Sequence, residues 1–310
     1  MIKARKESSE EVFFCAKEVK EVKRSRINRN CFIIFLVFLT SGIVNAQSNL
    51  LNAKSVSDIG KKNEQQLTSD NDAPIPYGYV DDRDIMWSKV VWEFIDLNQK
   101  INLPYYFPID TTSISSNRRS LFDSLIKGIK QGKIKEAYTD SFFTSKITQD
   151  EIDSRLVNVR EENGYTDTFR IQTQDVEGYM LKGMWYFDKR QGEMKYRLLA
   201  LAPMGKDVQT IGVENVDDET LYELFWIFFP NARDVLHNAK VFNPKNSSQP
   251  ISYDHLLNAR RFSSVIVREE NIYGNRAIED YVRGNSLFQL LEANKIKEDI
   301  RNREMDMWNY

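Results

Sequence analysis

Apolar residues recur with a helical period over much of the first half of the chain. From Met86 to Leu97 they return at steps of three and four positions, which predicts an amphipathic helix over residues 84–99. The same spacing predicts two further helices, at residues 119–131 and 149–160.

The ends of these helices carry recognisable signals. Ser120 is a plausible N-cap, Gly132 is suited to a helix end, and Thr148 with Glu151 has the pattern of a capping box. Residues 105–107 lie between two prolines, which predicts an extended aromatic connector.

In the middle of the chain the apolar period shifts toward two, as in β-strands. Residues 169–173 alternate, and residues 179–187 and 194–202 are longer apolar runs around the turn-like segment 188–193, which predicts a hairpin. Residues 221–229 are a further strand candidate, although a buried helix has a similar pattern.

Helical periodicity returns after the strands. It predicts helices at about residues 231–240, 253–261 and 276–305, the last of which could break near Gly284. The predicted fold class is therefore α+β, with helices flanking a small antiparallel sheet and a long C-terminal helical segment.

The sequence predicts one α+β domain at residues 79–310, with a helical part at about 79–160 and a sheet-containing part at about 165–310. Residues 47–78 are polar and end near two prolines, which is typical of a flexible tether that could order on a partner.

The amino-terminal segment has the pattern of a secretory signal peptide over residues 1–46. A basic stretch precedes the uncharged apolar run 31–46, and small residues favour cleavage after Ala46; the alternative is an uncleaved anchor. Both cysteines, Cys15 and Cys31, precede this site, so the processed chain would have no thiol and no lipid-bearing cysteine. Any membrane contact would then come through partners.

Charge excludes several classes of partner. From residue 47 onward the chain has 34 lysines and arginines against 40 acidic residues, a net charge of −6. Binding to nucleic acid needs a basic face, and the sequence has no polybasic membrane patch either.

No motif in the sequence predicts a catalytic residue, a cofactor or a metal ion. His237 and His255 each lack a ligand partner within one helical turn, and the acidic clusters at residues 81–84 and 217–219 are typical of helix starts. Residues 202–206 have one glycine and are predicted to be a strand-ending turn. An envelope hydrolase with a carboxylate pair, or a peptidoglycan- or carbohydrate-binding module with exposed aromatics, remains an alternative.

Aromatic residues account for 12% of the chain, and most must lie in its core. Some could instead anchor a protein interface, where Tyr and Trp are enriched. The candidates for such an interface are Tyr105, Tyr106, Trp226, Tyr273, Trp308 and Tyr310.

Several sequence blocks, in this order, resemble those of the GldN/PorN family of the type IX secretion and gliding-motility apparatus of Bacteroidetes. The resemblance covers roughly residues 79–310. Its blocks are D-D-R-D-I-M-W-S-K, L-P-Y-Y-F-P, L-F-W-I-F-F-P, V-F-N-P, Y-D-H-L-L-N-A-R-R-F-S-S, E-N-I-Y-G-N-R-A-I-E-D-Y and E-M-D-M-W-N-Y.

The resemblance implies a periplasmic structural protein and no catalysis. It implies self-association in a ring under the outer membrane, together with a GldK/PorK-type lipoprotein. It also implies contact with a GldM/PorM-type inner-membrane motor protein.

Overall fold

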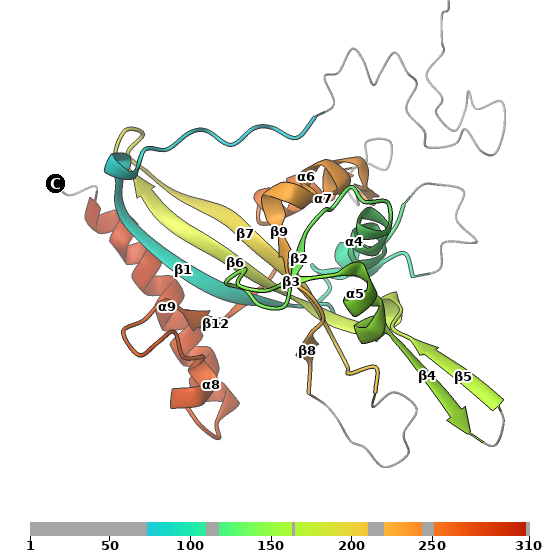
Figure 1. Cartoon of the computed structure of the whole chain (residues 1–310). Helices are drawn as coiled ribbons and strands as arrows, with labels where there is room; N and C mark the ends of the chain where they lie inside the picture. Colours follow the sequence, from blue (N-terminus) through green and yellow to red (C-terminus); the bar gives the residue numbers. More distant parts are fainter. Residues whose placement is uncertain (1–72, 110–117, 163–164, 210–219, 244–250, 308–310) are drawn as a thin grey trace, which may run out of the picture.

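A computed structural model describes residues 73–109, 118–162, 165–209, 220–243 and 251–307 (Figure 1). The predicted signal peptide, most of the predicted tether and the acidic cluster at residues 217–219 lie outside the described residues. The fold is α+β, as predicted: a curled antiparallel sheet is combined with several helices and a long C-terminal helix.

The main sheet has the strand order β12-β1-β6-β7-β8, and β9 also pairs with β7. All of its strand pairs are antiparallel. The strands are β1 (Ile85–Asp96), β6 (Val176–Asp188), β7 (Glu193–Gly205), β8 (Tyr222–Glu223), β9 (Ile227–Phe228) and β12 (Val265–Glu269).

The predicted hairpin is confirmed as β6 and β7, which pair from Asp188 and Glu193 at the turn to Val176 and Gly205 at the far end. The turn needs its glycine, because Gly192 has a φ of +66°. The prediction of a strand-ending turn at residues 202–206 is wrong in its placement, since β7 continues to Gly205.

The predicted helix at residues 84–99 is wrong, because this segment forms the long strand β1. β1 lies between β12 and β6, and both of its faces contact apolar side chains: Val91 packs in one cluster and Trp92 in another. A strand that is buried on both faces has apolar residues at nearly every position, which also satisfies a helical template.

Helices cover the sheet, and their bounds follow local signals closely. Ser120 caps α4 and Thr148 forms a capping box with Glu151 at α5, as predicted. The helices are α3 (Leu103–Tyr106), α4 (Leu121–Lys130), α5 (Gln149–Leu156), α6 (Phe229–Asn238), α7 (Tyr253–Asn258), α8 (Ile278–Tyr281) and α9 (Ser286–Met307), with 3₁₀ turns η2 (Asp82–Asp84) and η3 (Thr173–Asp175).

Two predicted segments differ in the structure. The connector at residues 105–107 was expected to be extended, but it begins within the short helix α3, whose first turn tolerates Pro104. The strand expected at residues 221–229 is interrupted. β8 and β9 both pair with β7, but the buried residues 224–226 between them belong to neither strand.

Three small two-stranded sheets are also present among the described residues. The hairpin of β4 and β5 extends away from the main sheet in Figure 1. The pairs are β2 (Ala137–Tyr138) with β3 (Lys146–Ile147), β4 (Val157–Glu162) with β5 (Tyr165–Arg170), and β10 (Lys240–Val241) with β11 (Ile251–Ser252).

A buried ion pair joins β1 to the segment that leads into β12. Glu93 is fully buried, and the guanidinium of Arg260 donates hydrogen bonds of 3.0 and 2.8 Å to its two carboxylate oxygens. The hydroxyl of Ser264 donates to the same carboxylate at 2.5 Å, and Lys297 of α9 donates to the carbonyl oxygen of Ser264. These bonds fix α9 relative to the sheet.

The middle of α9 is held by apolar packing. Ala293, Ile296 and Ile300 are buried in one cluster with Val91 of β1 and Ile266 of β12. Figure 1 shows α9 beside these two strands, whereas α4, α6 and α7 are grouped elsewhere on the molecule. Among the described helices, none has the combination of length and apolar composition that crossing a membrane requires.

Candidate protein-binding groove

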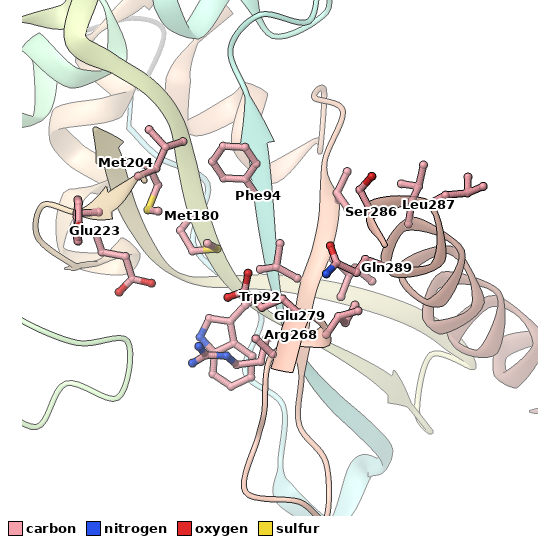
Figure 2. A pocket seen from close by; sticks show the side chains of 18 residues that line it. Trp92, Phe94, Met180, Met204, Glu223, Arg268, Glu279, Ser286, Leu287 and Gln289 are labelled. Carbon is pink, nitrogen blue, oxygen red and sulfur yellow. The ribbon is translucent and has the colours of Figure 1, made fainter. Parts of the chain in front are cut away.

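An apolar groove of about 940 Å³ runs over the edge strand β12, and we call it the edge groove. Phe94 of β1, Met180 of β6 and Met204 of β7 line it on the sheet side, and Leu287 and Leu290 of α9 line it on the helix side. Figure 2 shows Phe94 and Met180 on one side of the β12 ribbon and Leu287 on the other.

The position of Phe94 depends on a glycine in the neighbouring strand. A Cβ atom at Gly178 of β6 would lie 2.4 Å from two carbons of the Phe94 ring and 2.7 Å from the carbonyl oxygen of Ile95. Only glycine therefore leaves space for this ring on the sheet side of the groove.

The start of α9 exposes four large apolar side chains, of which Leu287 and Leu290 line the groove. Leu287, Phe288, Leu290 and Leu291 are 61%, 57%, 43% and 53% exposed. A contiguous exposed apolar patch on a folded protein is typical of a docking surface for another macromolecule.

Two hydrogen-bond donors beside the groove are unpaired. The indole nitrogen Nε1 of Trp92 and Nε of Arg268 are both buried, and neither has a hydrogen-bond partner among the described residues. The guanidinium carbon of Arg268 lies 5.7 Å from the centre of the Trp92 ring, so the two donors share one corner of the groove (Figure 2). Each buried unpaired donor costs about 1–3 kcal/mol.

Trp92 also takes part in an aromatic cage around a lysine. Nζ of Lys182 lies 5.0 Å from the centre of the Trp92 ring and 4.6 Å from that of Phe142, and it donates a 2.8 Å hydrogen bond to the carbonyl oxygen of Ser141. Burial lowers the pKa of Lys182, while the negative charge of Asp140 raises it.

The two acidic residues that line the groove belong to different elements. Oε2 of Glu223 accepts a 2.6 Å hydrogen bond from the indole of Trp226, and Glu279 lies in the first turn of α8. A glycosidase needs two facing carboxyl groups about 5–9.5 Å apart that are available to a substrate. The groove is better suited to binding an apolar protein segment.

A second depression differs because the chain fills it with its own residues. Residues 75–80, which we call the strap, run past α6 and α7 toward β1 (Figure 1). The ring of Tyr77 lies 4.9 Å from the guanidinium of Arg197 and 4.2 Å from that of Arg233, and its hydroxyl donates a 2.7 Å hydrogen bond to Asn258. Burial raises the pKa of Tyr77, and the charge of Arg233 opposes this shift.

The same two arginines hold the backbone of the strap. Arg233 donates a 2.6 Å hydrogen bond to the carbonyl oxygen of Ile75, and Arg197 donates a 3.0 Å bond to that of Gly78. Arg233 also forms a buried ion pair with Asp254, through hydrogen bonds of 2.8 and 3.1 Å. The last residues of the predicted tether therefore contact helices and strands of their own chain.

Both histidines line this strap pocket, a proximity that the sequence did not predict. His237 belongs to α6 and His255 to α7, and the pocket also contains the carboxylates of Asp188 and Asp254. In the described part of the chain, however, no three His, Cys, Asp or Glu side chains are arranged to hold a metal ion.

The candidate interface aromatics have different locations. Tyr105 and Trp226 are fully buried in the core and Tyr106 is half-buried, whereas Tyr273 is 68% exposed on a turn. The remaining candidates, Trp308 and Tyr310, lie outside the described residues. Burial thus assigns Tyr105 and Trp226 to the interior of this chain.

Sequence reasoning missed the edge groove, although one signal for it was present. Residues 287–291 contain four large apolar side chains at helical spacing, which predicts one wide apolar face at the start of this helix. The groove itself combines β1 with β12 and α9, which are far apart in the sequence.

Comparison with known proteins identifies the family. A family model described as gliding motility associated protein GldN matches residues 80–309, which include every described helix and strand. No individually curated protein matches the sequence. The chain therefore belongs to the GldN family of gliding motility associated proteins.

Proposed function

We propose that this protein is a non-enzymatic structural component that assembles with a lipoprotein into a ring associated with the outer membrane. Membership in the GldN family makes it a component of the gliding-motility and type IX secretion machinery. The ring and the partners are part of our proposal and do not follow from family membership alone. The edge groove, with its exposed leucines, is the observation that supports assembly.

The proposed partners follow the family. A GldK/PorK-type lipoprotein would connect the protein to the inner face of the outer membrane, and a GldM/PorM-type protein would connect it to the inner-membrane motor. The processed chain would be periplasmic after cleavage behind Ala46, and its membrane contact would come through these partners alone.

Burial of the exposed wall of α9 gives such assembly a physical basis. Fully burying one leucine or phenylalanine side chain contributes about 1.5–3 kcal/mol. The four exposed apolar residues of α9 are thus sufficient to contribute substantially to binding, even after the cost of association is subtracted.

Purification of the complex tests this function. Tagged full-length chain would be isolated from cells that also contain the lipoprotein and the motor protein, and the eluate would be examined by mass spectrometry and electron microscopy. We expect both partners and ring-shaped particles. Recovery of neither partner, with the tagged chain folded and exported, would contradict the proposal.

A further inference from the structure

A loop at the end of the edge groove presents two large apolar side chains to solvent. Residues 270–277 connect β12 to α8, and an isolated antiparallel bridge between Arg268 and Ala277 closes the base of this loop. At its tip, Ile272 is 91% exposed and Tyr273 is 68% exposed. We call these two tip residues the knob.

Hydrogen bonds within the loop brace the turn that carries the knob. Oδ1 of Asn271 accepts bonds of 3.0 Å from the backbone amides of Tyr273 and Asn275. In return, Oδ1 of Asn275 accepts a 3.1 Å bond from the backbone amide of Asn271. Asn275 has a φ of +60°, which asparagine adopts more readily than most residues. An ordered loop loses little conformational entropy on binding, so its exposed side chains are suited to a specific contact.

Exposed apolar side chains are concentrated around the knob. Seven large apolar side chains between residues 272 and 291 are 43% exposed or more. Besides the knob, they are Tyr281 at the end of α8 and the four residues at the start of α9 described above. Covering them would remove on the order of 600 Å² of surface per copy from water, close to the roughly 800 Å² per partner of a standard stable interface.

The knob and the edge groove are adjacent, but the knob does not fill the groove of its own chain. Arg268 lines the groove, and Ile272 follows it by four residues, which span at most about 14 Å when fully extended. Neither Ile272 nor Tyr273 is among the residues that line the groove, and both are exposed. The knob is therefore available to another molecule.

The chemistry of the knob matches that of the groove. Met180 and Met204 line the groove, and their flexible side chains can adapt to the shape of an apolar occupant. A buried tyrosine hydroxyl needs a hydrogen-bond partner, and the groove supplies the carboxylates of Glu223 and Glu279 as acceptors. A second copy of this chain thus carries an occupant that suits the groove.

The adjacency of the two surfaces determines the symmetry of such a contact. A domain of this size is roughly 40 Å across, so one neighbour at the knob and a different neighbour at the groove would collide. A single neighbour related by a two-fold axis satisfies both surfaces, because the same patch of each copy then contacts the other.

We propose that two copies pair about a two-fold axis, with the Ile272–Tyr273 knob of each copy in the edge groove of the other. This inference rests on the proposed structural role and assigns one of its contacts. Because a two-fold contact joins copies in pairs, closure of a ring needs a further contact at another surface.

Disulfide formation between engineered cysteines tests the contact. Two variants of the full-length chain, Ile272→Cys and Leu290→Cys, would be produced separately and together in cells that also contain the lipoprotein and the motor protein, and the exported material would be oxidised. We expect a covalent dimer when the two variants are mixed. Its yield should be at least ten times that of either variant alone or of the unmodified chain.

A chain with both substitutions distinguishes the possible arrangements. The two-fold contact predicts a covalent dimer and no larger species, since both disulfides join the same pair. A ladder of larger species would indicate a head-to-tail contact, and a disulfide within one chain would place the knob in its own groove; either result overturns the proposal. Recovery of the complex with both partners but without any 272–290 disulfide would also overturn it, while leaving the proposed function in place.

Removal of the tyrosine ring tests the role of the knob itself. Tyr273→Ala would be added to both cysteine variants, and we expect the yield of the 272–290 disulfide to fall at least tenfold. The melting temperature should stay unchanged, because this side chain is 68% exposed. Ile101→Glu, at another apolar position that is 56% exposed, is the control and should leave the yield unchanged. An unchanged yield with Tyr273→Ala would refute the proposal.

Discussion

The strap pocket and the edge groove are two depressions in the described part of the chain that differ in what covers them. In the strap pocket, Arg197 and Arg233 donate to the strap's carbonyl oxygens and their guanidinium groups lie close to the ring of Tyr77. In the edge groove, Trp92 and Arg268 have unpaired donors and the leucines of α9 are exposed. The chain covers the strap pocket with its own residues, whereas the apolar side chains at the edge groove are left exposed.

The two sites also differ in chemistry. The strap pocket contains charged groups that bind the backbone carbonyl oxygens of the strap, and only a short segment with the turn η2 separates the strap from β1. The edge groove has a mainly apolar lining, and covering it requires a segment with large side chains. Changes at the strap pocket should therefore reduce folding stability, and changes at the edge groove should reduce assembly.

The largest expected effect on stability is that of Arg233→Ala. The substitution leaves the carboxylate of Asp254 buried without its partner and removes the hydrogen bond to Ile75, so we expect a loss of about 3–5 kcal/mol in the free energy of unfolding. Urea denaturation measures this value. A loss below about 1 kcal/mol would show that the strap pocket does not stabilise the fold.

Removal of the strap's aromatic ring should have an intermediate effect. Tyr77→Ala abolishes the contacts with both guanidinium groups, each worth about 0.5–2 kcal/mol, and we expect a total loss of about 1–3 kcal/mol. The matched control Tyr77→Phe keeps the ring and loses only the bond to Asn258, at about 0.5–1.5 kcal/mol. Equal losses in the two variants would argue against stacking as the main contribution.

The smallest expected effect on stability is that of Leu287→Glu in the edge groove. Because this side chain is 61% exposed, its replacement should change the free energy of unfolding by no more than about 0.5 kcal/mol, while copy-to-copy association is lost. Ile296→Ala on the same helix is the contrasting control, since this buried residue should cost about 2–5 kcal/mol. A large destabilisation by Leu287→Glu would mean that the exposed wall belongs to the fold itself.

Local signals accounted for much of the fold that could be predicted. The capping residues of α4 and α5, the hairpin of β6 and β7 and the break before α9 all depend on neighbouring residues, and all agree with the structure. β1 could not be predicted in the same way. Its apolar residues fit either element type, and only its pairing with β6 and β12 determines that it is a strand.

The candidate site was less predictable than the fold. Nothing in the sequence indicated that Trp92, Arg268 and Leu290 line one groove, or that Tyr77 lies between Arg197 and Arg233. Residues of these types are ordinary core or surface residues when they are considered alone. Their roles depend on contacts between segments that are distant in the sequence.

By itself, the sequence determined the α+β class, the resemblance to the GldN family and the local helix ends, because composition, block order and short-range hydrogen bonds are all readable along the chain. Tertiary structure alone decided that β1 is a strand, that the strap covers one depression and that the groove over β12 stays open. The physical reason is that burial and pairing depend on which distant segments meet, and the apolar pattern of β1 is compatible with more than one such arrangement.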